Sequence, residues 1–227
     1  MGRNIMTDGV AKPARKTERR GAHSLASLAY NSVSDMIRHR QLRGGQVILE
    51  APLAESLGIS RTPLREALQR LEGEGRVQKG EGRNYVVRKV DLGEYLHSLR
   101  LRLLIEPEAA ALATPMIPGS VLSEVRREVN DLMTGAAYHT VSHWDSDDHL
   151  HDMIIDYCGN GVMGKVLREL RVTTRLFEID RLKDRLQPDS TEHLAILQAI
   201  EAGDPEATRR AVAVHIESLI AFARRNL

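Results

Sequence analysis

The amino-acid sequence predicts a mainly α-helical protein in two parts: a small N-terminal part with one β-hairpin and a larger C-terminal part that is an all-helical bundle. Apolar residues recur at helical spacing along most of the chain, and Gly and Pro residues separate the helical segments. Charge divides the chain as well, because residues 1–90 carry 17 Lys and Arg against 9 Asp and Glu, whereas residues 91–227 carry 15 against 22. A basic part joined to an acidic part is typical of a nucleic-acid-binding module attached to a domain with another task.

Length and composition narrow the class of protein. At 227 residues with 42% hydrophobic content, the chain is long enough for two domains, each with its own core. The single cysteine excludes an intramolecular disulfide, so nothing in the chain requires an oxidising compartment. The basic N-terminus lacks the apolar segment of a signal peptide, and no apolar run approaches the length of a membrane span. We therefore expect a soluble, cytoplasmic protein with no membrane contact.

The first elements follow from local patterns. Residues 1–22 are rich in charge and lack apolar periodicity, which predicts a flexible basic tail. Residues 24–40 place apolar side chains on one helical stripe and predict the first helix. A short apolar run at residues 47–49 leads to a second helix at residues 52–57, and Gly58 stands where a glycine commonly ends a helix.

The next segment, GISRTPLREAL at residues 58–68, predicts a helix with one buried and one basic face. Its apolar stripe, at positions i, i+3, i+4 and i+7, comprises Leu64, Ala67, Leu68 and Leu71. Ser60 or Thr62 can cap the open amides of the first turn. Two helices joined by a glycine turn form a helix-turn-helix, whose second helix enters the major groove of DNA. Arg61 and Arg65 then suit guanine or phosphate, and Thr62 suits phosphate or a thymine methyl group.

A β-hairpin is predicted after this helix. Strand-like runs at residues 77–79 and 85–87 flank a glycine-rich, partly basic tip. An ordinary surface hairpin would have the same pattern. Its position directly after a basic-faced helix favours a wing that adds a second phosphate contact through Lys79 and Arg83.

Residues 42–87 resemble the winged helix-turn-helix of the GntR family of bacterial transcription regulators, and the SRTPLREAL segment is the most specific part of the resemblance. The residues to which the resemblance assigns DNA contacts are Ser60, Arg61, Thr62 and Arg65, together with Gly80 to Arg83 in the wing. One position departs from the pattern. Ala51 stands where some members place an arginine after the glutamate that begins the second helix, so the contact those members make there stays open.

The rest of the chain predicts helices without strands. The candidate helices cover residues 91–114, 119–136, 142–158, 161–185, 189–202 and 204–225. A bundle of this kind packs its apolar stripes inward and often holds ligands between facing helices.

Acidic and histidine side chains at helical spacing predict a metal site in this bundle. Asp147 and His151 share a stripe that continues into apolar residues, so both face the interior. A neighbouring stripe has the composition of a solvated face and comprises Asp145, Asp148, His149, Asp152 and Asp156. His193 and His215 occupy inward positions on two further helices. Three imidazoles and one carboxylate suit zinc, nickel or another first-row divalent ion. Taken singly, an inward histidine is more often a hydrogen-bonded core residue than a metal ligand.

Residues 91–220 resemble the FCD effector domain of the FadR-like branch of the GntR family. The Asp-x-x-Phe-His pattern of that domain corresponds to residues 147–151, with Leu150 in place of the usual phenylalanine. The resemblance implies a divalent metal beside a pocket for a small carboxylate. The ligands it implies are Asp147, His151, His193 and His215, and it leaves the identity of the metal open.

Three arginines are candidates for binding the effector. Arg102 either pairs with Glu106 on its own helix or, as the Arg-x-x-x-Glu pattern of the family implies, holds the carboxylate of the effector through two hydrogen bonds. Arg171 and Arg175 lie four residues apart. Their spacing favours a solvated face, and pocket lining is the alternative.

Together these patterns predict a homodimeric DNA-binding transcription regulator rather than an enzyme. We expect a tail at residues 1–22, a DNA-binding domain at residues 23–90 and an effector-binding and dimerisation domain at residues 91–227. Two-fold symmetry would match two recognition helices to a palindromic double-stranded operator. The expected regulator is a repressor that responds to a small organic acid. One alternative is a metal-dependent hydrolase acting on nucleic acid, which the lack of an HExxH motif and of an evident general base disfavours. The other is a constitutive DNA-binding protein with a purely structural bundle.

Overall fold

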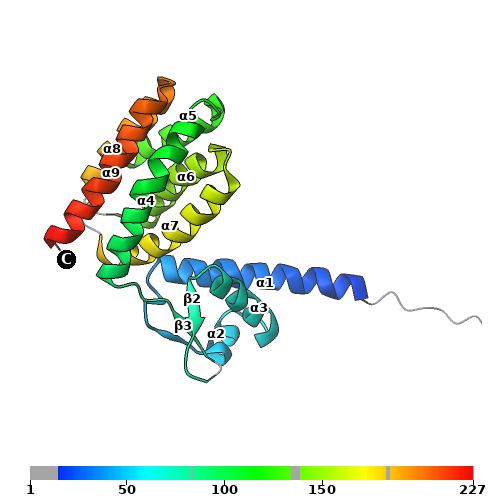
Figure 1. Cartoon of the computed structure of the whole chain (residues 1–227). Helices are drawn as coiled ribbons and strands as arrows, with labels where there is room; N and C mark the ends of the chain where they lie inside the picture. The colour runs from blue at the N-terminus through cyan, green and yellow to red at the C-terminus, as the bar shows by residue number, and fades with distance from the viewer. Residues whose placement is uncertain (1–14, 83, 134–138, 183–184, 227) are drawn as a thin grey trace, which may run out of the picture.

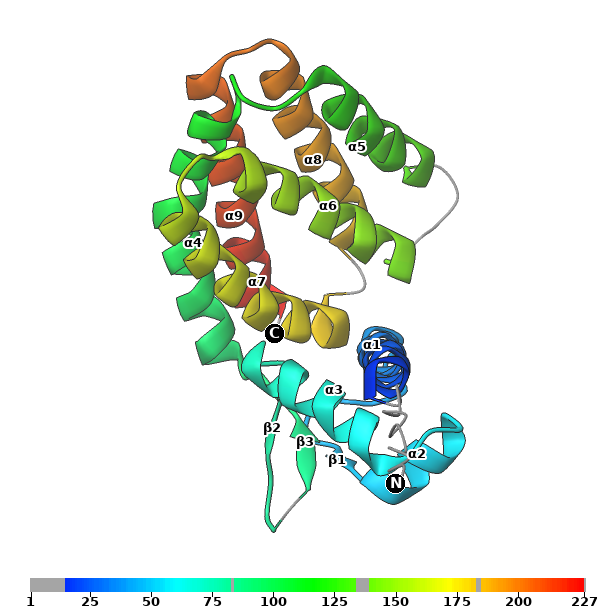
Figure 2. The same ribbon diagram turned by 90° about the vertical axis from the view of Figure 1, so that its right-hand side faces the viewer.

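The chain folds into two packed parts, and one long helix of the N-terminal part lies at their junction. The computed structural model describes residues 15–82, 84–133, 139–182 and 185–226, and these residues are mainly helical with one small antiparallel sheet, as predicted. Helices α4 to α9 form the bundle, and helix α1 lies between the bundle and the remaining N-terminal elements (Figures 1 and 2). None of the helices in the described part of the chain combines the length and the apolar character needed to span a membrane.

The N-terminal part is a helix-turn-helix with a wing. Its elements are α1 (Arg15–Arg38), β1 (Val47–Ile48), α2 (Glu50–Ser56), α3 (Arg61–Gly73), β2 (Val77–Lys79) and β3 (Tyr85–Val87). The hairpin predicted from the strand-like runs is present, and β3 lies at the centre of the sheet. The apolar run expected before the second helix forms β1, which pairs with β3 and so ties the wing to the start of α2.

Helix α1 corrects the predicted tail. It begins at Arg15 rather than at residue 24, so residues 15–22 are helical. Arg, Lys, Glu and Ala have high helix propensity, which allows a helix to form where the apolar stripe is absent. Residues 1–14 of the predicted tail lie outside the described residues.

The apolar stripe of α3 is buried as predicted. Leu64, Ala67, Leu68 and Leu71 are at most 2% exposed and pack in a core with α1, α2 and the sheet. Fully burying a leucine side chain contributes about 1.5–3 kcal/mol, so this stripe fixes α3 to the domain. Gly58 adopts a φ of 65° just after α2 and turns the chain toward α3.

The C-terminal part is a bundle of the helices expected there. They are α4 (Leu92–Ala113), α5 (Gly119–Leu132), α6 (Val141–Tyr157), α7 (Gly161–Arg181), α8 (Leu186–Glu201) and α9 (Pro205–Asn226). The predicted end of α7 at residue 185 is wrong, because this helix ends at Arg181 and α8 already begins at Leu186. Pro188 lies in the first turn of α8, where the missing N–H costs little.

The two parts meet through apolar and ionic contacts. Leu176 of α7 packs against the core of the bundle and against the core of the N-terminal part. Arg38, the last residue of α1, lies 2.6 Å from Asp145 of α6, and Arg40 lies 3.1 Å from Asp180 of α7. The N-terminal part therefore rests on the same two helices that carry Asp147, Arg171 and Arg175.

Candidate metal centre and nucleic-acid interface

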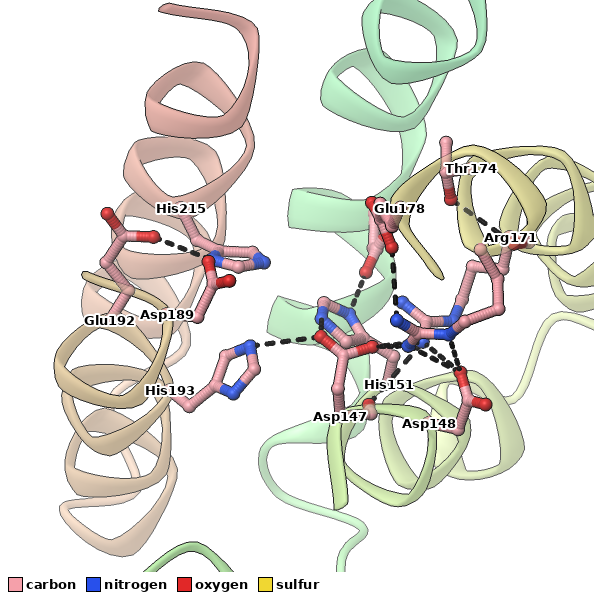
Figure 3. Close-up of polar contacts among 12 residues, drawn as sticks. Asp147, Asp148, His151, Arg171, Thr174, Glu178, Asp189, Glu192, His193 and His215 are labelled. Atoms are coloured by element: carbon pink, nitrogen blue, oxygen red, sulfur yellow. Dashed lines mark hydrogen bonds and ion pairs between the residues drawn. The ribbon is translucent and has the colours of Figure 1, made fainter. Parts of the chain in front are cut away.

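Four polar side chains from three helices meet inside the bundle (Figure 3). Asp147 and His151 come from α6, His193 from α8 and His215 from α9. One candidate ligand atom of each lies within 4.8 Å of those of the other three. The centres of the imidazole rings are 4.8–5.7 Å apart. The sequence singled out these four residues, and the structure brings them together.

Two buried imidazole nitrogens of this cluster lack an ordinary partner. Asp147 Oδ1 lies 3.3 Å from His193 Nε2 and 3.8 Å from His151 Nε2. Neither nitrogen makes a hydrogen bond to any described residue. Buried polar atoms are nearly always paired, and a cation shared with the carboxylate would pair both nitrogens. The candidate ligand atoms already lie within 4.8 Å of one another, so these residue types and this spacing fit a divalent ion that would be held between them.

The protonation states suit metal binding. Burial lowers the pKa of His215, and it holds the pKa values of His151 and His193 well below the usual histidine range. The positive charge of Arg171 acts in the same direction on His151 and His193. All three imidazoles are therefore neutral at pH 7, and the neutral imidazole is the form that binds a metal.

Arg102 lies deep in the bundle and holds a carboxylate of its own helix. Its Nε donates to Glu106 Oε2 over 2.7 Å, and its Nη1 donates to Thr174 Oγ1 over 3.1 Å. Glu106 is fully buried and also contacts Nδ1 of His151. Burial opposes ionisation of Glu106, but Arg102 and His151 outweigh it and hold the Glu106 pKa well below its usual value. The intrahelical pair considered from the sequence is thus formed, in the interior rather than at the surface.

Arg171 and Arg175 correct the solvated-face interpretation of their spacing. Their side chains are 7% and 12% exposed, and both reach from α7 to the carboxylates of α6. Figure 3 shows Arg171 in this position. Arg171 Nη2 lies 2.8 Å from Asp147 Oδ2, and Arg175 contacts the same oxygen. Burial lowers the pKa of Arg175 to about 10, so its guanidinium stays positively charged. The two arginines therefore face the interior of the bundle, as the alternative interpretation of their spacing expected, and not solvent.

Asp148 was expected on a solvated stripe, but it contacts the same two arginines. Its Oδ1 accepts hydrogen bonds from Arg171 over 2.8 Å and from Arg175 over 2.7 Å, and burial raises its pKa. Arg175 also lies over the ring of Trp144, 4.9 Å from the ring centre. The arginine pair therefore lies between Trp144 near the start of α6 and the cluster of Asp147 with the three histidines.

Sequence reasoning missed three residues beside this cluster. The sequence indicates Glu106 only as the partner of Arg102, and it assigns no role to Glu192, which accepts from His215 Nδ1 over 2.8 Å. Arg185, 1% exposed, holds Glu192. No spacing rule links Glu106 to His151, because 45 positions separate them.

The predicted DNA-contacting residues of α3 lie on its free face. Ser60, Arg61, Thr62 and Arg65 are all exposed, opposite the buried stripe. Ser60 is the N-cap residue, but its hydroxyl makes no capping hydrogen bond, so this part of the capping prediction is wrong. An uncapped helix N-terminus leaves N–H groups free for a phosphate. Arg65 Nε lies 2.6 Å from Glu50 and is half-exposed, which allows it to exchange that partner for DNA.

The wing exposes one of the two basic side chains that are predicted to contact DNA. Lys79 is largely exposed, with Nζ 3.9 Å from Glu72. At Gly80, a Cβ atom would approach Cγ2 of Val86 to 2.6 Å, so a larger residue would force the Val86 side chain or the hairpin to shift. Arg83 lies outside the described residues.

Two family models match most of the chain. The model of the FCD domain matches residues 97–218, and the model of bacterial regulatory proteins of the gntR family matches residues 25–87. These are the two segments whose motifs resemble those families.

Relatives with curated names are transcription regulators. An uncharacterized HTH-type transcriptional regulator of Bacillus subtilis (strain 168), YdhC, is 22% identical over 193 residues, which cover 82% of this chain and 85% of the relative. The HTH-type transcriptional repressor RspR of Escherichia coli (strain K12) is 22% identical over 197 residues, or 83% of this chain and 84% of the repressor. Among solved structures, E. coli McbR/YncC has a TM-score of 0.72 at 21% identity over 88% of this chain and 97% of that one, which is a likeness of fold.

Proposed function

This chain belongs to the GntR family of bacterial regulatory proteins, among the members with an FCD domain, and on that premise we propose a homodimeric repressor that releases operator DNA when a small carboxylate binds beside a divalent metal. The family and the named relatives make the protein a DNA-binding transcription regulator and not an enzyme. For its domains we retain the predicted division at residue 90. The apolar core of the N-terminal part ends at Val87, and Val90 already packs in the core of the bundle, which supports a boundary within three residues of the predicted one.

The observation that carries the metal proposal is the cluster of Asp147 with three buried, neutral histidines, two of which have unpaired Nε2 atoms. The ligands would be Asp147, His151, His193 and His215. A bound ion would supply a positive centre with coordination positions left for a carboxylate. Imidazole and carboxylate donors suit zinc or nickel, and metal analysis of the purified protein distinguishes the two.

Arg171 and Arg175 are the groups that we assign to the effector. Both guanidinium groups lie beside Asp147, so a carboxylate bound at the metal would be within their reach. Two donors on each guanidinium can hold a carboxylate through paired hydrogen bonds. We assign Arg102 a different role from the one that the resemblance implies, because its guanidinium contacts Glu106 and Thr174 and not Asp147, whereas Arg171 and Arg175 contact Asp147 itself.

In the proposed regulator, the surface that binds DNA is the exposed face of α3 together with the wing. We propose that Ser60, Arg61, Thr62 and Arg65 contact the operator, with Lys79, Gly80 and Arg83 adding contacts from the wing. A two-fold dimer would set two such faces against the two halves of a palindromic site.

The DNA half of the proposal is tested on a duplex selected from random-sequence DNA by the purified protein. Arg61→Ala and Arg65→Ala should each weaken binding by about 1–3 kcal/mol, measured by fluorescence anisotropy at fixed salt. Arg127→Ala is the matched control, because Arg127 is exposed on α5 in the bundle. Equal affinity of all three variants would contradict the assignment of α3 as the recognition helix.

The effector half is tested by a thermal-shift screen of metabolic carboxylates on metal-loaded protein, with each hit retested for release of the selected duplex. We expect at least one carboxylate to raise the melting temperature and to weaken DNA binding. If no carboxylate changes either quantity, the protein binds DNA constitutively and its bundle is structural.

A further inference from the structure

Metal binding by histidine depends on which ring nitrogen carries the proton. A neutral imidazole has one protonated and one unprotonated nitrogen, and only the unprotonated nitrogen can bind a cation. His151 directs Nε2 toward Asp147 Oδ1. The ring nitrogen of His215 that does not contact Glu192 lies on the side facing His151 (Figure 3). Both residues can therefore bind a cation within the cluster only if Nδ1 carries the proton and Nε2 does not.

Glu106 provides an acceptor for that proton at His151. Its Oε1 contacts His151 Nδ1, and both side chains are fully buried. Arg102 fixes this carboxylate through two hydrogen bonds of 2.7 and 3.2 Å. Thr174 of α7 in turn accepts from Arg102 over 3.1 Å. The carboxylate has no freedom to turn away, so the ring of His151 is held with Nε2 toward Asp147.

Glu192 repeats this arrangement at His215 with residues from other helices. Its Oε2 lies 2.8 Å from His215 Nδ1. Nη2 of Arg185 donates to both oxygens of Glu192 over 3.0 Å, and Arg185 is 1% exposed. An arginine, a glutamate and a histidine thus stand in the same order on two sides of the cluster.

We infer that Glu106 and Glu192 are positioning residues that hold the Nδ1 proton of His151 and of His215 and thereby set the affinity of the cluster for a divalent cation. The inference rests on the proposed metal site and adds four residues to it, since Arg102 and Arg185 hold the two carboxylates. Carboxylates behind metal-binding histidines fix the ring and increase the basicity of the ligand nitrogen.

The arrangement around Glu192 could also be taken for a second metal site, because Asp189, Glu192 and His215 lie close together. Arg185 argues against it. Its guanidinium contacts Asp189 as well as Glu192, so the charge that would attract a second cation is already paired. The inference therefore requires one bound ion per chain, and two bound ions would overturn it.

The first experiment compares affinities for Zn²⁺ by competition with a chromogenic chelator. Glu106→Gln and Glu192→Gln remove the negative charge that holds the proton, and each should weaken binding about 10–100-fold. The matched controls are Glu108→Gln on α4 and Glu217→Gln on α9, both exposed glutamates, and they should bind Zn²⁺ as the unchanged protein does. Unchanged affinity in both test variants would overturn the inference.

A further variant separates this inference from the metal site itself. Asp147→Asn should abolish tight binding if the cluster is the site. If it binds Zn²⁺ normally, the proposed metal site fails. If it loses binding while Glu106→Gln and Glu192→Gln do not, the site stands and only the positioning role fails.

The second experiment needs no change at Glu106 and so does not depend on the stability of a variant. Long-range ¹H–¹⁵N correlation spectra of the metal-free protein report which ring nitrogen carries the proton. His151→Gln and His215→Gln variants assign the two signals. We expect the Nδ1–H tautomer at both residues, and an Nε2–H tautomer at either one would overturn the inference for that residue.

Discussion

At the scale of single residues, Asp147 contacts neutral histidines through one carboxylate oxygen and positively charged arginines through the other. Its Oδ1 faces the unpaired nitrogens of His151 and His193, and its Oδ2 accepts from Arg171 and Arg175. If the cluster holds a divalent cation as proposed, Asp147 would share its negative charge with that cation and pair less strongly with the arginines. The donors of Arg171 and Arg175 would then be available to an incoming carboxylate, so effector binding would depend on the metal.

The buried histidines predict how the stability of the metal-free protein changes with pH. Unfolded histidine takes up a proton near pH 6.5, whereas burial keeps His151, His193 and His215 neutral in the folded chain at that pH. Below about pH 6.5 the unfolded state therefore binds more protons, and the free energy of unfolding falls by up to about 1.4 kcal/mol per pH unit for each histidine. A hydrogen bond to Glu128 raises the pKa of His149, which acts in the opposite direction but is one exposed residue against three buried ones.

Urea unfolding of metal-free protein between pH 7.5 and pH 5 measures this effect. We expect little change between pH 7.5 and about pH 6.5, a progressive loss of stability from there to pH 5, and a smaller loss in a His193→Gln variant that keeps its fold. A free energy of unfolding that is constant between pH 7 and pH 5 would contradict the assignment of neutral buried histidines.

At the scale of elements, α3 shows how one helix divides anchoring from recognition. Four apolar residues fix it to the core, and the residues predicted to contact DNA lie on the opposite face. The same division of faces operates in α6, where Asp147 and His151 face the cluster and Asp156 faces solvent. In both helices the periodicity of 3.6 residues decides which side chains can act together.

Leu68→Ala should loosen the recognition helix without touching its DNA-binding face. Leu68 is fully buried, and removing a buried leucine side chain costs about 2–5 kcal/mol through lost burial and the cavity left behind. We expect a lower urea midpoint by circular dichroism for the transition of the N-terminal part, together with weaker DNA binding. Gln69→Ala, at the exposed neighbouring position, should change stability by less than about 0.5 kcal/mol. Equal effects of the two substitutions would contradict the assigned anchoring role.

The periodicity of single helices made most of this fold predictable, and it predicted the four clustered residues because each lies on the inward stripe of its helix. It could not predict Asp148, Arg171 and Arg175 correctly, because their burial depends on how α6 packs against α7. Glu106 and Glu192 were missed because a carboxylate behind a histidine is defined by contact between helices, which spacing along one helix does not record. The predicted start of α1 was wrong because residues 15–22 form a helix through their high helix propensity, without the apolar stripe on which the prediction depended.

At the scale of the whole molecule, the junction places the DNA-binding part on the helices that carry the candidate site. Arg38 pairs with Asp145, two residues before Asp147 on α6, and Arg40 pairs with Asp180 on α7. An effector changes DNA affinity only if it favours one arrangement of the two parts over another. A shift of α6 or α7 on effector binding would act directly on these two ion pairs.

Asp145→Asn combined with Asp180→Asn should therefore reduce the coupling between the two parts and leave each part intact. Both carboxylates are more than one-third exposed, and exposed ion pairs contribute about 0–1 kcal/mol each, so the melting temperature should change little. Affinity for Zn²⁺ and for the selected duplex, each measured alone, should also stay near that of the unchanged protein. The quantity expected to fall is the ratio of DNA affinities without and with the carboxylate identified by the screen, which corresponds to a coupling free energy of about 1–3 kcal/mol in typical allosteric proteins.

Asp156→Asn is the matched control for this prediction, because Asp156 lies on the same helix as Asp145 and pairs with Arg168 of α7 at the exposed surface of the bundle, away from the junction. It should leave the ratio unchanged. If the double variant responds to the carboxylate as fully as the control does, the signal does not pass through the two ion pairs. Leu176 of α7, which packs against both cores, would then be the next contact to substitute.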